Sequence, residues 1–473
     1  MVPANRGLLS VSWGAVAGAI DIVLRETLLF AASGILLGGI DDLVVDLGYA
    51  VIALRSLGRR RYARISDLPV PTGGRRLVVF VAAWDESAVI GAMLRTALAR
   101  FDHPHYHLYV GAYPNDRATI DAVAAVAETD SRVRLVIGEQ PGPTTKGDCL
   151  NTLWQALERD EQDGAKRADA IILHDAEDVV HPGELRVFDH FVADHATVQL
   201  PVLPLVDRGS RMISGHYCDE FAESHAKQLV VRAALGAGLP LAGVGCAISR
   251  DALDRLAAAR GGAPFDPSSL TEDYELGLTV ARDGGRGVFV RIDGADGDLV
   301  AVRAYFPAAL DAAVRQKARW MTGIALAGWD RIGWSRWSDW REHWMRMRDR
   351  RAPLAVLVLC AAYLALFAWA GSQVCHWLAG TPPPAPRPAM RALLLGNALL
   401  MGWRLAMRAT FTGRTYGWRE ALLAIPRSLV ANVVAMLAAR RAVVLYVRMM
   451  VDGMPRWEKT AHVFPDSVAD TAS

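Results

Sequence analysis

Two apolar stretches, residues 27–54 and 353–378, constrain the fold of this 473-residue chain more than any other feature. Each is long enough to cross about 30 Å of hydrocarbon as an α-helix. Basic residues at 59–61 follow the first stretch, and the basic sequence RMRDRR precedes the second. Because basic residues concentrate on the cytoplasmic side of membrane segments, both of these ends are predicted to be cytoplasmic. The sequence between them is therefore expected to form a cytoplasmic domain.

The C-terminal part of the chain contains two further apolar stretches. The sequence TPPPAPRP at 381–388 predicts a turn, because successive prolines cannot continue a helix, so residues 389–411 are expected to return across the membrane. The last stretch, 421–449, includes Arg440 and Arg441, whose charges are costly in lipid. We expect this stretch to be an interfacial or re-entrant helix, with a fourth span as the alternative.

These stretches divide the chain into five predicted regions. Residues 1–66 form an N-terminal segment with one transmembrane helix, 67–330 the cytoplasmic domain, 331–352 an interfacial helix, 353–411 two transmembrane helices, and 412–473 the interfacial or re-entrant helix and a tail. The chain is 52% hydrophobic with a net charge of +2, which excludes general disorder and argues against nucleic acid as a partner. Its five cysteines show no paired spacing, so a disulfide framework is not expected.

Acidic residues within the first apolar stretch predict ion pairs inside the membrane. Asp42 and Asp46 are four residues apart and share a helix face, and Arg404 and Arg408 have the same separation. Since unpaired carboxylates are costly in lipid, we predict that Asp42 meets Arg404 and that Asp46 meets Arg408. The alternative is that the first span ends near residue 40 and a new interfacial helix begins at Asp41.

Apolar strands and amphipathic helices alternate through the cytoplasmic region. Strands are predicted at 75–83, 107–113, 132–138 and 169–178, and helices at 117–128, 146–159 and 183–193. This alternation predicts an α/β domain with a doubly wound sheet. Ligands bind at the carboxyl ends of the strands in such sheets, so the polar residues there are candidates for a site.

Two of these strands end in carboxylates. Glu86 follows the first strand, and the fourth strand ends in a sequence that contains Asp175 and Glu177. Asp175 and Glu177 are two residues apart and can face one ligand from extended backbone, and hard oxygen ligands suit Mg²⁺ or Mn²⁺. The alternative for these two acids is a solvated turn. Lys146 opens the helix after the third strand, where a cation would meet a phosphate, or else is a surface lysine.

Five motifs in order carry a family resemblance. They are AWDESAVI, PTTKGDCLN, LHDAEDVVHP, LTEDYELG and the sequence QKARW at 316–320. Over about residues 75–325 the chain resembles membrane-embedded glycosyltransferases of family 2, whose catalytic domain has the GT-A fold. Within that family its motifs are most similar to bacterial inner-membrane proteins named for phage adsorption. The resemblance implies an α/β GT-A catalytic domain flanked by transmembrane helices.

The resemblance also implies a role for each motif residue. Asp273 is expected to be the general base, and Asp175 and Glu177 to hold Mg²⁺ or Mn²⁺, although Glu177 stands where the family has aspartate. The donor side would be formed by Glu86, Asn115, Asp116, Lys146 and Asp175, and the acceptor side by Glu272, Gln316, Arg319 and Trp320.

Simpler structural roles compete with several of these assignments. Thr271 before an apolar helical run is a good N-cap, and residues 316–320 also fit an amphipathic interface helix. Glu220 and Glu223 are expected on one helix face that borders the acceptor cleft. The pair of glycines at Gly243 and Gly245 lacks the third glycine of a dinucleotide-binding fingerprint and is set aside.

The function favoured by the resemblance is inverting, metal-dependent transfer of a sugar from a nucleotide-sugar donor to a lipid-linked or growing-glycan acceptor. The protein would be a multi-pass protein of the bacterial inner membrane with a cytoplasmic catalytic domain, and its partners would include membrane lipids and an export or outer-membrane protein. A processive polysaccharide synthase with export is one alternative. A catalytically degenerate scaffold or phage-receptor component is the other.

Overall fold

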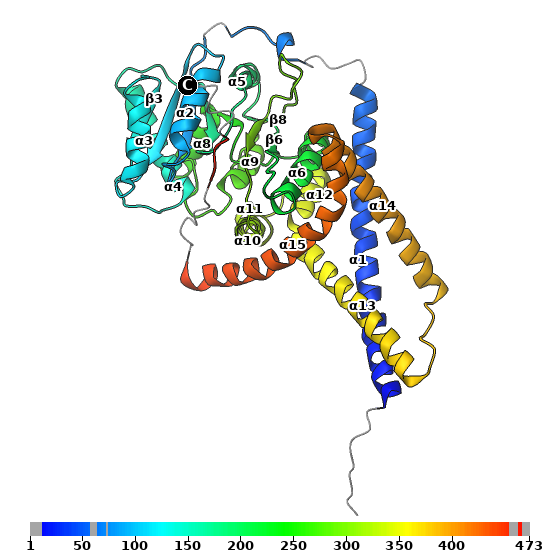
Figure 1. Ribbon diagram of the computed structural model, residues 1–473. Helices are drawn as coiled ribbons and strands as arrows, with labels where there is room; N and C mark the ends of the chain where they lie inside the picture. The colour runs from blue at the N-terminus through cyan, green and yellow to red at the C-terminus, as the bar shows by residue number, and fades with distance from the viewer. Residues whose placement is uncertain (1–11, 57–63, 72–73, 454–461, 466–473) are drawn as a thin grey trace, which may run out of the picture. The chain divides into compact units, whose positions relative to one another are not determined.

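The computed structural model describes residues 12–56, 64–71, 74–453 and 462–465 (Figure 1). The chain forms two compact units. One consists of residues 1–47 and 351–407, and the other of residues 48–350 and 408–473.

The first unit is helical. It contains the N-terminal part of α1 (Trp13–Ser56), the whole of α13 (Ala352–Ala379) and most of α14 (Pro388–Tyr416). Glycines let these helices approach closely, because a Cβ on Gly34 would lie 2.5 Å from Val358 of α13. Small residues have this role where membrane helices pack together.

Acids of α1 pair with basic residues inside this unit. Asp42 accepts hydrogen bonds from Arg351 at 2.6 Å and from Arg404 at 2.7 Å, so the predicted Asp42–Arg404 pair is confirmed. Asp46 accepts one from the Trp403 indole at 2.8 Å. Arg408 belongs to the other unit, and its pairing with Asp46 stays a prediction. The alternative of a new helix beginning at Asp41 is wrong, because α1 is continuous through that residue.

The second unit is an α/β domain. Its strands are β1 (Leu77–Ala82), β2 (Tyr106–Ala112), β3 (Val133–Ile137), β4 (Ala170–His174), β5 (Thr197–Gln199), β6 (Val202–Pro204), β7 (Cys246–Ser249), β8 (Gly287–Phe289) and β9 (Val302–Ala304). Its shorter helices are η1 (Ile65–Asp67), α2 (Ile90–Arg100), α3 (Arg117–Ala127), α4 (Lys146–Gln162), α5 (Glu184–Phe191), α6 (Ile213–Glu223), η2 (Ser224–Gln228), α7 (Leu229–Leu235), α8 (Arg250–Ala259), α9 (Glu272–Arg282), α10 (Leu310–Trp320), η3 (Met321–Ala327), α11 (Gly328–Ile332) and α12 (Trp340–Arg350). The last helix, α15 (Trp418–Asp452), also belongs to this unit.

Seven strands form one mixed sheet in the order β3-β2-β1-β4-β7-β5-β8. The four predicted strands are β1 to β4 and pair in parallel, as expected for a doubly wound sheet. Strand β7 pairs antiparallel with both β4 and β5, which the sequence did not predict. Strands β6 and β9 form a separate parallel pair.

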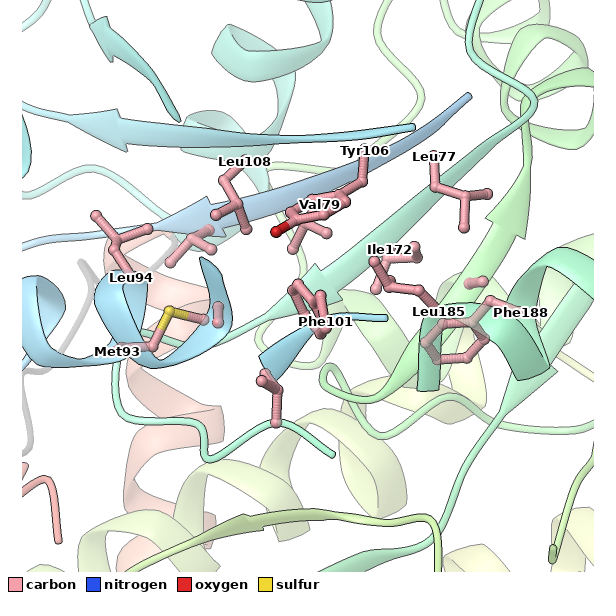
Figure 2. Close-up of a cluster of buried hydrophobic side chains, with 14 of the residues drawn as sticks. Leu77, Val79, Met93, Leu94, Phe101, Tyr106, Leu108, Ile172, Leu185 and Phe188 are labelled. Atoms are coloured by element: carbon pink, nitrogen blue, oxygen red, sulfur yellow. The ribbon is translucent and has the colours of Figure 1, made fainter. Parts of the chain in front are cut away.

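The central strand β1 is buried on both faces because its whole sequence, LVVFVA, is apolar. Leu77 and Val79 point into one core cluster, which Figure 2 shows with Met93 of α2 and Phe188 of α5. The alternate residues, which include Phe80, belong to a second cluster with residues of α4 and α8. Helices therefore cover both faces and leave the carboxyl ends of the parallel strands to carry polar residues.

Three helices of the described part of the chain are long and apolar enough to cross a membrane, namely α1, α13 and residues Trp418–Val451 of α15. Helix α14, which we predicted to cross at 389–411, is not among them. Helix α15, predicted to be interfacial, packs against α6 and α10, and its Arg427 is buried in ion pairs with Asp219 and Glu420. Length and composition alone do not assign a span, so the crossing of α14 and the interfacial position of α15 stay predictions.

Candidate active site

The loops that follow β1 and β2 carry three of the predicted donor-side residues. Asp116 is the N-cap of α3, and its carboxylate also accepts the backbone N–H of Asp85 at 2.6 Å. Asn115 exchanges two side-chain hydrogen bonds with the backbone of Gly142, at 2.7 and 2.8 Å. Glu86 is only 6% exposed. Asn115 and Asp116 thus fix the loops around Glu86.

Lys146 and Asp175 form an ion pair at the carboxyl end of β4. The Lys146 ammonium lies 2.5 Å from Asp175 Oδ1 and 3.5 Å from the carbonyl oxygen of Gly243. The Lys146 side chain is 17% exposed, so the interpretation as a surface lysine is wrong. Although burial opposes both charges, Asp175 and Glu272 raise the pKa of Lys146, and Lys146 lowers the pKa of Asp175. The pair is therefore ionised at neutral pH.

A buried histidine holds the turn that carries Asp175. The two ring nitrogens of His174 lie 2.8 Å from Asp178 and 2.7 Å from Glu184. Asp178 also accepts the backbone N–H of Asp175 at 3.0 Å. Burial opposes the charge of His174, but the two carboxylates raise its pKa to about 10. This group was not predicted from the sequence, although a histidine at a strand end with acids four and ten residues later was a usable signal.

Glu177 lies in a second group of polar side chains, with Glu86 and His462. One ligand atom from each of the three lies within 4.8 Å of the others, a separation that suits a metal ion. Burial raises the pKa of Glu177 to about 8, and the carboxylates of Asp175, Asp178 and Glu86 add to this effect while His462 opposes it. Crowded carboxylates of this kind are stabilised by a bound cation. Sequence reasoning missed His462, which no motif marks.

Asp273 occupies the first turn of α9. Thr271 stands at the N-cap position, but its side chain makes no capping hydrogen bond, so capping alone does not explain this motif. Burial raises the pKa of Asp273 to about 7, and the charge of Glu272 adds to the effect while Lys146 opposes it. A carboxylate with such a pKa accepts a proton readily near neutral pH.

Gly243 brings the backbone close to Asp273. Its φ is +76°, and a Cβ at this position would lie 2.6 Å from Asp273 Oδ2. The carbonyl of the same residue accepts the long hydrogen bond from Lys146. The sequence pattern around this glycine indicates no more than an incomplete dinucleotide-binding fingerprint. In the structure it is the residue between Lys146 and Asp273.

The predicted acceptor-side residues lie mainly on α10. The Trp320 ring lies 6.1 Å from the Tyr217 ring and 6.5 Å from the Phe306 ring, measured between centroids. Arg319 is near enough to lower the pKa of Asp175. Gln316 has a buried side-chain oxygen without a hydrogen-bond partner among the described residues. Of these α10 residues, Arg319 is the one that acts on the Lys146–Asp175 pair.

Two acids that were expected to border the acceptor cleft are held in ion pairs. Glu220 pairs with Lys317 of α10. Glu223 pairs with Lys227 at 2.7 Å and with Arg408 at 3.1 Å. Their place beside an acceptor stays a prediction.

The structure brings the sequence-predicted acids to one end of the sheet. The charge of Asp175 raises the pKa of both Glu177 and Asp273, so the three carboxylates lie within electrostatic range of one another. Lys146 interacts with Asp175, Glu272 and Asp273. That these residues act together on a substrate stays a prediction.

Comparison with protein families gives the class to which this site belongs. The model named glycosyltransferase like family 2 matches residues 75–323, which is more than half of the chain. The chain belongs to this family. This is the family that its motifs implied.

Two curated relatives extend the similarity beyond this glycosyltransferase domain. They are bacteriophage adsorption protein B of Escherichia coli K12 and bacteriophage N4 adsorption protein B of Escherichia coli O157:H7. Each is 35% identical over 474 residues, which cover 92% of this chain and 62% of the relative. The glycosyltransferase chain thus spans about 62% of the length of these proteins.

A solved structure shares the fold. It is the mannosyltransferase PcManGT of Pyrobaculum calidifontis in complex with GDP-Man and Mn²⁺, which matches 86% of the glycosyltransferase chain and 99% of its own with a TM-score of 0.53. At 19% identity this likeness shows the fold alone. The prediction of a GT-A domain with flanking apolar helices is confirmed.

Proposed function

We propose that this glycosyltransferase moves a sugar, with inversion, from a nucleotide-sugar donor to a lipid-linked or growing-glycan acceptor at the cytoplasmic face of a bacterial inner membrane. The observation that carries the proposal is the meeting of Lys146, Asp175 and Asp273. The Lys146 ammonium is a cation suited to bind a diphosphate, and the Asp273 carboxylate is suited to remove a proton.

Asp273 is the proposed general base. It would take the proton of the acceptor hydroxyl as that oxygen attacks the anomeric carbon from the side opposite the leaving diphosphate, which inverts the configuration. The Asp273 carboxylate can occupy its position because Gly243 has no Cβ to displace it. Trp320 and its aromatic neighbours would pack against the acceptor sugar.

The donor diphosphate is proposed to lie between Lys146 and the acids at the ends of β1 and β4. Lys146 sits at the N-terminal end of α4, where the helix dipole also favours a negatively charged group. The carboxylates of Glu86 and Glu177 fit a divalent cation, because they offer hard oxygen ligands that crowd one another, and Asp175 lies within electrostatic range of Glu177. Such a cation, as Mg²⁺ or Mn²⁺, would neutralise the departing diphosphate.

The membrane part of the proposal rests on sequence and composition. Apolar helices of spanning length and basic residues beside α1 and α13 favour a membrane protein with a cytoplasmic catalytic domain. A membrane position suits an acceptor that is itself lipid-linked. Participation of an export or outer-membrane protein is proposed from the names of the phage-adsorption relatives.

A panel of labelled nucleotide sugars tests this function. Membranes that contain the full chain are incubated with each donor and with Mn²⁺ or Mg²⁺, and label is followed into lipid-extractable and polymeric products. Transfer from one donor supports the proposal, and product length separates single transfer from processive synthesis. Failure of every donor to give a product would favour the degenerate scaffold.

The pH dependence of transfer is predicted from Asp273. Because its pKa is raised to about 7, the carboxyl is mostly protonated at pH 6 and unable to accept a proton. We expect kcat/KM to rise through an apparent pKa near 7 and to level off above it. The profile is measured at two saturating Mn²⁺ concentrations, because added metal competes with protons at Glu177 but not at Asp273. A limb that moves with the Mn²⁺ concentration would contradict the assignment to Asp273.

A further inference from the structure

Both ends of α15 are fixed to the α/β unit. Near its start, Glu420 accepts a hydrogen bond from Arg211 at 2.7 Å, and Arg427 donates one to the Arg211 carbonyl oxygen at 2.6 Å. Beyond its end, Phe464 is 7% exposed and belongs to the core cluster that contains residues of β1 and α2. The two ends of a helix that crosses a bilayer lie on opposite sides of about 30 Å of hydrocarbon. Contacts of both ends with one α/β unit therefore argue against a crossing by α15.

Contacts along its length also hold α15 on this unit, where it runs beside α10 (Figure 1). Val434 packs with Tyr217 of α6, Ala438 packs with Ala318 of α10, and the Tyr446 hydroxyl donates a hydrogen bond to Asp330 at 3.1 Å. A crossing by α15 would carry these elements, with their charged side chains, into hydrocarbon, which is unfavourable.

The opposite face of α15 is apolar and exposed. Large apolar side chains that are at least 41% exposed recur at every third or fourth position, among them Leu422, Ile425, Leu429, Val433, Leu437 and Val447. Residues at this spacing share one side of an α-helix. From Trp418 to Val451 they form an apolar stripe about 50 Å long, since a helix rises 1.5 Å per residue.

The exposed charges beside this apolar stripe are basic. Arg419, Arg440 and Arg448 are exposed, and the Arg419 guanidinium lies 5.5 Å from the centre of the Trp418 ring. Residues 418–451 contain one acid, Glu420, which is 6% exposed and paired with arginines of the unit. A helix with tryptophan and aliphatic residues on one side and arginines beside them is suited to bind an anionic lipid surface.

The path of the chain assigns the crossings differently from composition. Residues 48–350 and 408–473 belong to the α/β unit, so the segment 351–407, with α13 and most of α14, leaves that unit and returns to it. A segment that leaves one side of a bilayer and returns to the same side crosses an even number of times, so α14 crosses if α13 does. Composition favours α1, α13 and α15 as spans, whereas this path favours α1, α13 and α14.

We propose that α15 lies in the plane of the membrane surface without crossing it, with its apolar stripe among the acyl chains and Arg419, Arg440 and Arg448 at the phosphate groups of anionic phospholipids. The inference rests on the membrane part of the proposed function and is independent of sugar transfer. Because α15 packs on α10, the bound lipid surface would hold α10 about one helix diameter, or about 10 Å, from the membrane.

Spin-label depth in reconstituted vesicles tests the orientation of α15. The labelled variants of the full chain are Ile425→Cys, Val433→Cys, Leu437→Cys and Val447→Cys, each with the exposed Cys360 changed to serine, in vesicles of phosphatidylcholine and phosphatidylglycerol. Accessibility to oxygen and to a water-soluble nickel chelate gives the depth of each label. We expect all four within about 10 Å of the headgroups. A crossing helix would place the labels at 433 and 437 at least about 10 Å deeper than the other two.

Helix α13 supplies the matched control for a crossing helix. Leu357, Leu366 and Val374 are exposed along α13, and Leu366 lies near its middle. A label on Leu366→Cys is expected to lie about 10 Å deeper than labels on Leu357→Cys and Val374→Cys. The two helices should therefore give different depth profiles in the same vesicles.

Replacement of the three arginines tests the role of anionic lipid. Each basic residue near an anionic surface changes partition into it about five-fold. In vesicles that contain phosphatidylglycerol, the combined variant Arg419→Gln, Arg440→Gln and Arg448→Gln is expected to shift the label on Ile425→Cys from lipid towards water at least about 10-fold. The matched control carries the same substitution at three exposed arginines of α2, α4 and α8, namely Arg95, Arg159 and Arg255, and should leave the label in lipid.

The outcomes distinguish this inference from the proposed function. Deep labels at 433 and 437 would overturn the in-plane position, and labels shielded from both oxygen and the chelate would show that a protein, such as a second copy of the chain, covers the stripe instead of lipid. Water-exposed labels along α13 would overturn the membrane part of the proposed function and this inference with it. Four shallow labels on α15 without sugar transfer from any donor would support the inference and overturn the transfer function.

Discussion

Replacement of Asp273 by asparagine is expected to lower sugar transfer by about 100- to 10,000-fold, because the amide cannot accept a proton from the acceptor hydroxyl. The substitution keeps the shape of the side chain. It also removes a carboxyl whose pKa is already raised to about 7 by burial and by Glu272, so the fold should tolerate the change. The measurement is single-turnover transfer from the donor that the panel identifies.

The matched control is Asp283→Asn at the other end of the same helix. Asp283 is exposed and follows the last residue of α9, so its change alters the charge of the chain equally but far from the proposed base. Asp283→Asn should retain wild-type transfer, and both variants should bind Mn²⁺ like the wild type. Equal transfer by the two variants would contradict a catalytic role for Asp273.

Gly243→Ala is expected to lower kcat/KM about 100-fold while the chain still folds. A Cβ at this position would lie 2.6 Å from Asp273 Oδ2, so the carboxylate has to move, and displacement of a reacting group by about 1 Å costs about 100-fold in rate. The φ of +76° adds a strain of about 1–2 kcal/mol for any residue with a Cβ. Transfer and thermal unfolding are measured together.

Gly261→Ala separates strain from displacement. Gly261 has a φ of +73°, close to that of Gly243, but a Cβ there would meet no atom within 4 Å. It should therefore show the same loss of stability without the loss of transfer. If both variants lose transfer to the same degree, the effect is strain, and the role given to Gly243 in positioning Asp273 is wrong.

The parallel half of the sheet could be predicted from the sequence because its strands are continuous apolar runs separated by amphipathic helices. Strands β1 to β4 lie where the pattern indicates them. The antiparallel strand β7 was not predicted, because its four residues, CAIS, carry too short a pattern to distinguish it from a loop. Its place between β4 and β5 depends on pairing partners that are distant along the chain.

The candidate acids were predictable because several like charges at the end of an apolar strand are unfavourable unless a cation neutralises them. The sequence did not reveal that these acids belong to two groups with different partners. Asp175 pairs with Lys146, whereas Glu177 lies with Glu86 and His462. Which oxygen meets which cation depends on side-chain directions that no spacing encodes.

The sequence by itself determined the family, the α/β class, the apolar helices of spanning length and the identity of the proposed base. Each of these features depends on a local pattern of residue types. Only the tertiary structure decided that Gly243 makes room for Asp273, that His174 holds the turn of Asp175, and that a tail histidine reaches Glu86 and Glu177. The physical reason is that these contacts join residues far apart along the chain. Such contacts form only when packing of the core has brought the strand ends together.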